Sequence, residues 1–411
     1  MTDTSLIELS RGTRRAPRLR SFARGLVLSR LAALRHGRLR LRNGDEVLDF
    51  GASSGPPDAT LTVLDPAFYA DIAFGGSVGA GESYMLGTFE VDDLTALMRI
   101  MLRNRDMLDA MEGGMARFAA PLRRVAHWLH RNTRAGSRRN ISAHYDAGND
   151  FFRLFLDEMM MYSCALFTRP EMSLAEASSA KLDAICARLQ LGPADHVLEI
   201  GTGWGGFAMH AASRHGCRVT TTTISPSQYQ LARERVRAAG LEDRITILRE
   251  DYRDLRGTYD KVVSIEMIEA IGHQYFGEFF RVCAERLARG GRMLLQSITI
   301  ADRRFAAARD DVDFIKRYIF PGCCIPSVTA LAQTMTASSD LRIVHLEDIG
   351  PHYATTLARW RDNLFANLDR VRALGYPDTF IRMWEFYLCY CEAGFAERAL
   401  GDVQMLLTRE G

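Results

Sequence analysis

The stretch at residues 196–207, HVLEIGTGWGGF, constrains the fold of this chain more than any other. A short apolar run contains Glu199, and glycines then alternate with other residues until helix-forming residues begin. This pattern predicts a parallel strand that passes through a tight turn into a helix. Gly201, Gly203 and Gly205 let backbone N–H groups approach a ligand without obstruction by a Cβ atom, and the helix N-terminus favours a negative group such as a carboxylate. We therefore expect a ligand at this turn.

The neighbouring residues favour S-adenosylmethionine over a dinucleotide as that ligand. Glycine-rich turns of this kind serve dinucleotides, flavins and S-adenosylmethionine. A dinucleotide site usually has an acid about 20 residues further on, after the second strand, where it holds a ribose. Here the second expected strand, 217–223, is followed by ISPSQ without an acid, and Glu199 is the acid available instead. The glycine density disfavours an ordinary strand, turn and helix without a ligand.

Composition is that of a globular protein long enough for two domains. The chain has 411 residues, of which 47% are hydrophobic, and can bury a substantial core. No apolar run reaches the ~18 residues of a membrane span and no signal peptide is recognised, so we expect a cytoplasmic protein. The eight cysteines have no zinc-like spacing, which predicts reduced thiols and no metal. The net charge of +2 does not favour nucleic acid as a partner.

Arginines are concentrated near the start of the chain. Eleven arginines and no acid lie within residues 11–42. The bland interpretation is a solvated basic arm. The alternative is peripheral attachment to an anionic membrane, because residues 21–35 resemble an interfacial amphipathic helix, although Gly25 weakens the pattern. Its apolar face would consist of Phe22, Leu26, Val27, Leu31 and Leu34.

The first part of the chain predicts a small α+β domain, residues 1–130. A hairpin is expected at 39–50 around Asn43-Gly44, a strong two-residue turn. A strand at 59–64 and helices at 66–74 and 91–102 complete it. We interpret the arginine-rich residues 103–139 as a linker that leads into the second domain.

The second domain, residues 131–411, predicts an α/β fold. Strands and helices alternate from residue 196, which predicts a doubly wound parallel sheet with helices on both faces and the ligand at the carboxyl ends of the strands. Strands are expected at 196–200, 217–223, 244–249, 260–266, 291–300, 342–347 and 402–408. Helices are expected at 205–215, 226–239, 274–289, 353–371 and 376–394, together with a helical insertion after the fifth strand.

Six motifs follow one another in this domain. They are NISAHYDAGNDFF at 140–152, MYSCA at 161–165, the turn at 199–206, MIE at 267–269, YIFPG at 318–322 and HYATTL at 352–357. Together they resemble the cyclopropane-fatty-acyl-phospholipid synthase family, which includes relatives that act on mycolic acids. The resemblance covers residues 135–411 and implies a class I S-adenosylmethionine methyltransferase fold.

The resemblance also implies ligand roles for residues of these motifs. The methionine part of S-adenosylmethionine would be covered by Tyr145, Tyr162 and Ser163. The nucleoside would be lined by Thr223, Gln228, Asp251 and Tyr252. A bicarbonate ion beside the alkene would be held by Cys164, Glu269 and Tyr353.

One position departs from the family pattern. Family members carry a bicarbonate-binding histidine after the fifth strand, where this chain has Gln296. Glutamine can donate a hydrogen bond to an anion but cannot supply positive charge or exchange a proton near neutral pH. The departure puts the choice between ring closure and another product in doubt.

The leading hypothesis is transfer of a methylene from S-adenosylmethionine to the cis double bond of an unsaturated phospholipid acyl chain, which forms a cyclopropane. The chemistry requires an in-line methyl group, a carbocation sheltered from water, and a base that takes a proton from the added methyl. We expect bicarbonate, with Glu269 as proton acceptor, to serve that last step.

Three alternatives remain. The same alkene could give a methyl-branched or methylene-bearing chain, or the protein could bind S-adenosylmethionine at a membrane without catalysis. Methylation of a small amine or phenol is disfavoured, because such a substrate would leave the N-terminal domain without lipid to bind. That domain is expected to associate with an anionic membrane surface or to form a homodimer.

Overall fold

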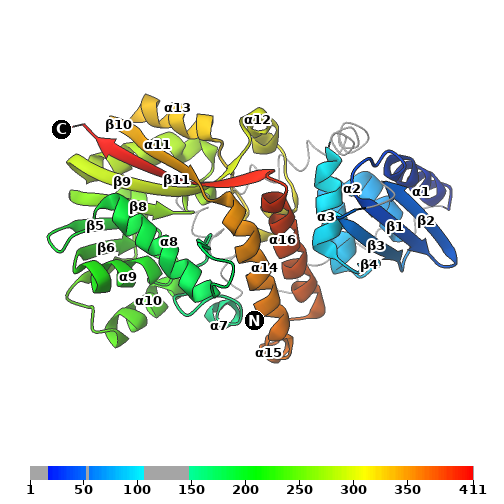
Figure 1. Ribbon diagram of the computed structural model, residues 1–411, viewed down its shortest axis with the longest axis horizontal. Helices are drawn as coiled ribbons and strands as arrows, with labels where there is room; N and C mark the ends of the chain where they lie inside the picture. The colour runs from blue at the N-terminus through cyan, green and yellow to red at the C-terminus, as the bar shows by residue number, and fades with distance from the viewer. Residues whose placement is uncertain (1–16, 52–54, 106–147, 411) are drawn as a thin grey trace. The chain divides into compact units, whose positions relative to one another are not determined.

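The computed structural model describes residues 17–51, 55–105 and 148–410 (Figure 1). The chain divides into two compact units, Met1–Ala119 and Ala120–Gly411. The linker expected at 103–139 lies almost entirely outside the described residues. In the described parts of the chain, no helix combines the length and the apolarity that crossing a membrane requires.

The N-terminal unit contains a four-stranded sheet of order β2-β1-β3-β4. β1 and β2 pair antiparallel, which confirms the predicted hairpin, while β1 and β3 are parallel. The second helix is longer than expected, because two helices join across a kink at Gly76, where φ is 58°. β4 was not predicted. The described elements are α1 (Pro17–Leu31), β1 (Arg38–Asn43), β2 (Glu46–Gly51), β3 (Asp58–Val63), α2 (Ala67–Met85), β4 (Phe89–Val91) and α3 (Leu94–Arg103).

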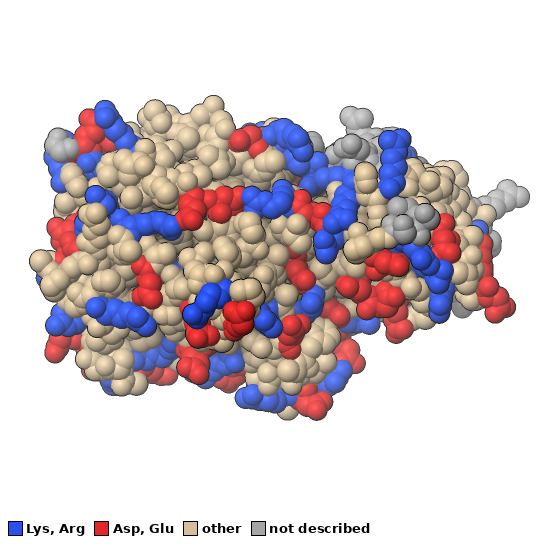
Figure 2. Space-filling view, viewed as in Figure 1, with Lys and Arg blue, Asp and Glu red and all other residues tan. Residues whose placement is uncertain are grey.

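Helix α1 packs on its own unit. Val27, Leu31 and Leu34 are buried, and α1 contacts α2. Phe22 remains 56% exposed. The expectation that these apolar residues form a face free for a membrane is therefore wrong for most of them, because the same face fills the core of the unit. Figure 2 shows acidic and basic side chains interspersed over the visible face of this unit.

The second unit contains a seven-stranded sheet of order β10-β11-β9-β8-β5-β6-β7. Strands β7, β6, β5, β8 and β9 are parallel neighbours, as predicted. β11 is antiparallel to both β9 and β10, which corrects the expectation of a wholly parallel sheet. The strands are β5 (His196–Ile200), β6 (Arg218–Thr222), β7 (Ile245–Leu248), β8 (Tyr259–Ile265), β9 (Leu287–Ile300), β10 (Leu341–Asp348) and β11 (Leu400–Arg409).

The reversal of β11 follows from the helices that precede it. The long helices α14 (Gly350–Ala366) and α16 (Asp378–Ala396) pack against each other, with α15 (Leu368–Ala373) at their far end (Figure 1). The chain leaves β10 along α14 and returns along α16, so it enters β11 from the end of the sheet that it had left. Alternation of strands and helices in the sequence does not reveal this return.

Helices cover both faces of the sheet (Figure 1). One face packs against α8 (Leu174–Leu189), α9 (Gly206–His215) and α10 (Pro226–Ala238), and the other packs against α11 (Phe276–Arg286) and α13 (Val328–Ser338). Successive strand residues point to opposite faces, so Val197 and Val263 belong to the first core and Leu198 and Val262 to the second. The remaining short elements are α7 (Gly148–Phe152), η3 (Tyr252–Asp254), η4 (Ile268–Ile271) and η5 (His273–Tyr275).

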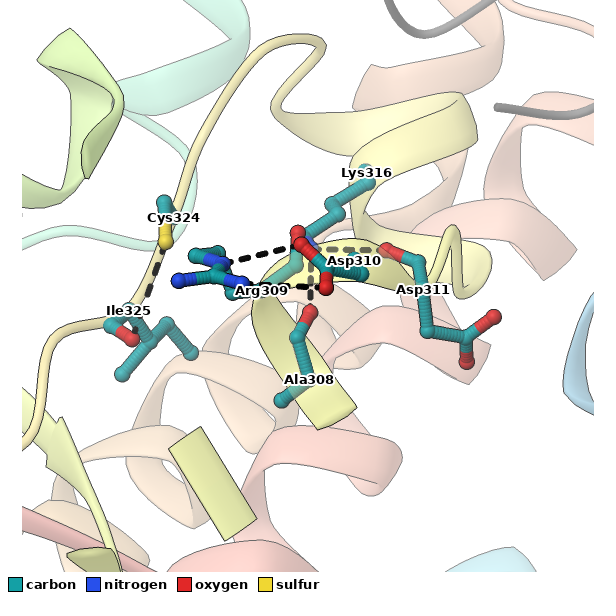
Figure 3. Close-up of polar contacts among 7 residues, drawn as sticks. All are labelled: Ala308, Arg309, Asp310, Asp311, Lys316, Cys324 and Ile325. Carbon is teal, nitrogen blue, oxygen red and sulfur yellow. Dashed lines mark hydrogen bonds and ion pairs between the residues drawn. The ribbon is translucent and has the colours of Figure 1, made fainter. Parts of the chain in front are cut away.

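The insertion after β9 is held in shape by Lys316. It contains α12 (Asp302–Asp310) and the π-helix η6 (Ile315–Ile319). The Lys316 ammonium donates hydrogen bonds to the carbonyl oxygens of Ala308 at 2.5 Å and Asp311 at 2.7 Å, which satisfies acceptors at the C-terminal end of α12 (Figure 3). The insertion then returns to the sheet, because Cys324 N donates to the Glu269 carbonyl at 2.8 Å.

Candidate functional site

The glycine turn at the carboxyl end of β5 has the predicted form. Gly201, Gly203 and Gly205 have φ values of 106°, 51° and 86°, in the left-handed region that favours glycine. Gly205 caps α9, and no heavy atom lies within 4 Å of a Cβ added at Gly203. At Gly201 such an atom would lie 3.3 Å from Met267 Cγ, so the turn adjoins the end of β8. The turn presents open backbone to a ligand.

Glu199 supports a ligand at this turn. Its side chain is buried, and its Oε2 has no hydrogen-bond partner among the described residues. Burial raises the pKa of Glu199 to about 8. Buried polar atoms are rarely left without a partner, so an unpaired oxygen beside an open turn fits a ligand that donates a hydrogen bond. The residues therefore fit S-adenosylmethionine.

The second predicted cofactor segment lies at the carboxyl end of β6. Thr223 Oγ1 donates to Gln228 Oε1 at 2.9 Å, and both side chains are buried. Ser225 is the N-cap residue of α10, and its hydroxyl accepts from Gln228 N at 3.3 Å. The structure thus brings Thr223 and Gln228 together, as their assignment to one ligand requires.

Asp251 and Tyr252, the predicted adenine edge, are engaged with protein groups. The Asp251 carboxylate accepts two hydrogen bonds from the Arg253 guanidinium, at 2.8 and 2.7 Å, and a third from Arg253 N at 3.1 Å. Tyr252 packs edge-on against Phe279 with a ring-centroid distance of 5.8 Å, within the core under α11. Their contact with adenine stays a prediction.

The residues expected to cover the methionine part are only partly described. Tyr145 lies outside the described residues. The Tyr162 hydroxyl is 2.9 Å from the Tyr387 hydroxyl. Ser163 Oγ accepts a hydrogen bond at 2.8 Å from Lys181, which is fully buried on α8, and burial lowers the pKa of this lysine. Lys181 was not predicted, although a lysine among the apolar residues of α8 is unusual in a chain with only three lysines.

Three of the predicted anion-binding residues converge on the carboxylate of Glu266. Glu266 Oε1 accepts from Cys164 N at 2.8 Å and from Gln296 Nε2 at 2.8 Å. Glu266 Oε2 accepts from the Tyr353 hydroxyl at 2.6 Å. Sequence reasoning missed Glu266, although an acid directly after a buried strand could have indicated it.

Glu269 does not join this convergence. Its Oε1 accepts from Ser297 Oγ at 2.7 Å and from Ile298 N at 2.5 Å, and its Oε2 has no partner among the described residues. Burial, and secondly the charge of Glu266, raise the pKa of Glu269 to about 8. The expected set of Cys164, Glu269 and Tyr353 around one bicarbonate ion is thus altered, because a side-chain carboxylate takes the donors. In this arrangement the Glu266 carboxylate occupies the place of the anion, so a bicarbonate ion does not fit between the hydrogen-bond donors that were expected to hold it.

Side chains of the neighbouring strand β11 also hold the Gln296 side chain in place. Gln296 Nε2 also donates to Asp402 Oδ2 at 3.0 Å, and Gln404 Nε2 donates to Gln296 Oε1 at 3.0 Å. Burial, and secondly the charge of Glu266, raise the pKa of Asp402 well above its usual range. Asp402 and Gln404 were not predicted, because they reach the site through the unexpected antiparallel pairing of β11 with β9.

None of the eight cysteines, all of which lie in the described residues, forms a disulfide. Across residues 17–51, 55–105 and 148–410, no group of three His, Cys, Asp or Glu side chains could hold a metal ion. The Cys164 thiol is fully buried, and burial raises its pKa, so Cys164 contributes its backbone N–H to the site.

Comparison with known proteins agrees with this geometry. The family model of mycolic acid cyclopropane synthetase matches residues 132–405. The chain is 40% identical to the tuberculostearic acid methyltransferase UfaA1 of Mycobacterium tuberculosis, over 82% of this chain and 80% of that protein. It is 35% identical to the cyclopropane-fatty-acyl-phospholipid synthase of Escherichia coli K12, over 87% of this chain and 90% of that protein.

A solved structure shares the fold of the second unit. The mycolic acid cyclopropane synthase CmaA1 complexed with SAH and CTAB is 30% identical, with a TM-score of 0.61 over 66% of this chain and 98% of that one. The glycine turn, the sheet and the family match agree. The chain belongs to the mycolic acid cyclopropane synthetase family and is an S-adenosylmethionine-dependent methyltransferase.

Proposed function

We propose that this protein methylates a carbon of a cis double bond in a phospholipid acyl chain and releases a methylene-branched chain. S-adenosylmethionine supplies the methyl group as an electrophile on its sulfonium. Of the two relatives described above, one is named as a tuberculostearic acid methyltransferase and the other as a cyclopropane-fatty-acyl-phospholipid synthase. The identity is greater with the methyltransferase, 40% against 35%.

A run of aromatic rings carries the proposal. It begins at Trp204 of the glycine turn, which lies 5.0 Å from Phe152 between ring centroids. Phe152 is 5.3 Å from Tyr162, which stacks on Trp360 at 5.1 Å. Trp360 is 6.0 Å from Tyr353, the residue that donates to Glu266. The rings thus extend from the glycine turn to three neighbouring acidic side chains, here called the carboxylate cluster: Glu266, Glu269 and Asp402.

Such a run suits attack by an alkene. An alkene is a weak nucleophile, so the chain must hold it in line with the methyl group and exclude water from the carbocation that forms. Aromatic faces stabilise a nearby cation by about 0.5–2 kcal/mol each. The aromatic surface also favours an apolar acyl chain over a small polar substrate.

The product depends on how the cation is quenched. A hydride shift from the methylated carbon to its neighbour, followed by loss of a proton from the added methyl, gives a methylene branch. Loss of the same proton with closure of a bond to the neighbouring carbon gives a cyclopropane. The cyclopropane is the second candidate, favoured by the similarity to the E. coli synthase.

The test is incubation of the full chain with S-adenosylmethionine and vesicles of oleoyl phospholipids, followed by mass spectrometry and proton NMR of the fatty acids. We expect a gain of one CH2 unit with vinylidene proton signals. Upfield ring-proton signals would favour the cyclopropane instead. Unchanged fatty acids would contradict both products and favour a non-catalytic binding protein.

We also propose that the reaction takes place at the surface of an anionic membrane, where the phospholipid is found. The exposed arginines of the N-terminal unit support this location. A homodimer formed through that unit is a further proposal, which sedimentation of the full chain would test.

A further inference from the structure

Glu266 occupies a strained position at the functional edge of the sheet. It directly follows β8, and its φ of 49° lies in the left-handed region that non-glycine residues rarely adopt. Its neighbour Met267 borders the glycine turn at Gly201. Strained backbone is retained where the surrounding structure enforces it, often at functional sites. The position of this carboxylate therefore calls for a functional explanation.

The hydrogen bonds around Glu266 hold its carboxylate in one orientation. Oε1 accepts two of them, from Cys164 N and Gln296 Nε2, whereas Oε2 accepts one, from the Tyr353 hydroxyl. An ionised carboxylate has about four acceptor positions. Of these three donors only Tyr353 reaches Oε2, which therefore lies next to the aromatic run that ends at Tyr353.

The other acids of the cluster are less suited to accept a proton. Asp402 is fully buried and Glu269 is 8% exposed, and burial raises the pKa of both, so their neutral forms are favoured. Glu266 is only partly buried, and three hydrogen-bond donors hold its carboxylate in place. Among the described residues of the cluster, Glu266 is the best placed to exchange a proton with solvent.

We propose that Glu266 Oε2 accepts the proton lost from the added methyl group, so that a side-chain carboxylate replaces a bound anion as the base. This inference rests on the proposed function. After the hydride shift, a C–H bond of the methyl breaks, its electron pair becomes the second bond of the C=CH2 group, and the proton moves to Oε2. Partial exposure lets Glu266 return the proton to water after the product leaves.

Replacement of Glu266 by glycine gives a direct test. Glycine adopts a φ of 49° without strain, so Glu266→Gly removes the carboxylate and should still fold. The space it leaves is surrounded by the same three donors and should accept formate. Glu266→Gln keeps the shape of the side chain and leaves no such space. Glu242→Gln is the matched control, because Glu242 is an exposed acid that pairs with Arg237.

We expect the wild type to work equally well in buffer freed of bicarbonate. Glu266→Gln and Glu266→Gly should lower kcat by about 10²–10⁴, as at other general acid–base positions, while calorimetry finds unchanged S-adenosylmethionine affinity. Formate should restore part of the activity of Glu266→Gly but not of Glu266→Gln. Formate should also raise the Tm of Glu266→Gly alone, a measurement that needs no activity. Glu242→Gln should match the wild type.

The outcomes separate the two proposals. A wild type that needs bicarbonate, or a Glu266→Gly variant with full activity in buffer without formate or bicarbonate, would overturn the role of Glu266 and leave the methyltransfer standing. A wild type that forms no methylated fatty acid under any condition would overturn the proposed function. In that case, a Tm of Glu266→Gly that formate does not raise would also contradict an anion-binding site at position 266.

Discussion

Tyr353 donates a hydrogen bond from its hydroxyl to Glu266 Oε2 at 2.6 Å, across 87 positions of the sequence. The bond joins α14 to the end of β8. The Tyr353 ring also stacks on Phe395 of α16, with 4.4 Å between ring centroids. Burial raises the pKa of Tyr353 well above its usual value, so the hydroxyl stays protonated and donates. Helix α14 and the end of strand β8 therefore meet at Glu266, the proposed base.

Tyr353→Phe should lower kcat without changing S-adenosylmethionine affinity. The substitution keeps the stacked ring and removes one hydrogen bond to a charged group, which is worth about 1.5–3 kcal/mol. That corresponds to a loss of roughly ten- to hundredfold in kcat. Tyr259→Phe is the control, because the Tyr259 hydroxyl donates to the Arg256 carbonyl at the opposite end of β8. Equal losses in both variants would refute a specific role for Tyr353.

Gly203→Val should abolish S-adenosylmethionine binding while the fold survives. A Cβ atom added at Gly203 has no heavy atom within 4 Å, so the valine would extend into the space that we assign to the ligand. Gly240→Val is a matched control: Gly240 has a φ of 65° and equally open surroundings, but it follows α10, away from the turn. Calorimetry should find normal affinity for the control. Normal affinity in Gly203→Val as well would show that the ligand lies elsewhere.

Glu269→Gln should stabilise the protein more at pH 8 than at pH 5. Burial raises the pKa of Glu269 from its ordinary value of 4.5 to about 8. Its contribution to stability is therefore complete below pH 4.5 and is lost as the pH rises to about 8, at up to about 1.4 kcal/mol per pH unit. Glutamine does not ionise, so the Tm of the variant relative to wild type should rise across this window. Thermal unfolding with the same Tm difference at both pH values would contradict a buried neutral Glu269.

Charge reversal at Arg20, Arg35 and Arg42 should weaken binding to anionic vesicles. All three are exposed, whereas Arg24 and Arg40 form ion pairs with acids of the same unit. Each arginine near an anionic surface contributes about 1 kcal/mol, which salt screens. Co-sedimentation should therefore fall with substitution to Glu and with salt, and zwitterionic vesicles provide the control. Binding that responds to neither change would exclude this role. Deletion of residues 1–42 is a poorer test, because it removes α1 and most of β1.

Local patterns predicted the elements of the sheet and the cofactor turn. Alternating glycines after β5 predicted a tight turn, and the structure has such a turn, with positive φ values at Gly201, Gly203 and Gly205. Asn43-Gly44 predicted the hairpin of β1 and β2. These features depend on residues that are close in the sequence, so the sequence alone could predict them.

Features that depend on distant contacts were missed. The partnership of Gln296 with Asp402 and Gln404 requires the pairing of β11 beside β9, which no local pattern encodes. Glu266 was not predicted as a site residue, because the MIE motif that carries the family resemblance contains Glu269, three residues later. In α1, periodicity correctly grouped Val27 and Leu31 but could not tell a membrane from the core of the unit.

Transfer from S-adenosylmethionine with a fully deuterated methyl group tests the central claim most directly. The full chain is incubated with this donor and oleoyl phospholipid vesicles, and the deuterium content of the fatty acids is read by mass spectrometry. Methyl transfer followed by proton loss from that methyl predicts a product that keeps two of the three deuterium atoms. A product that keeps all three, or one that carries none, would contradict the account.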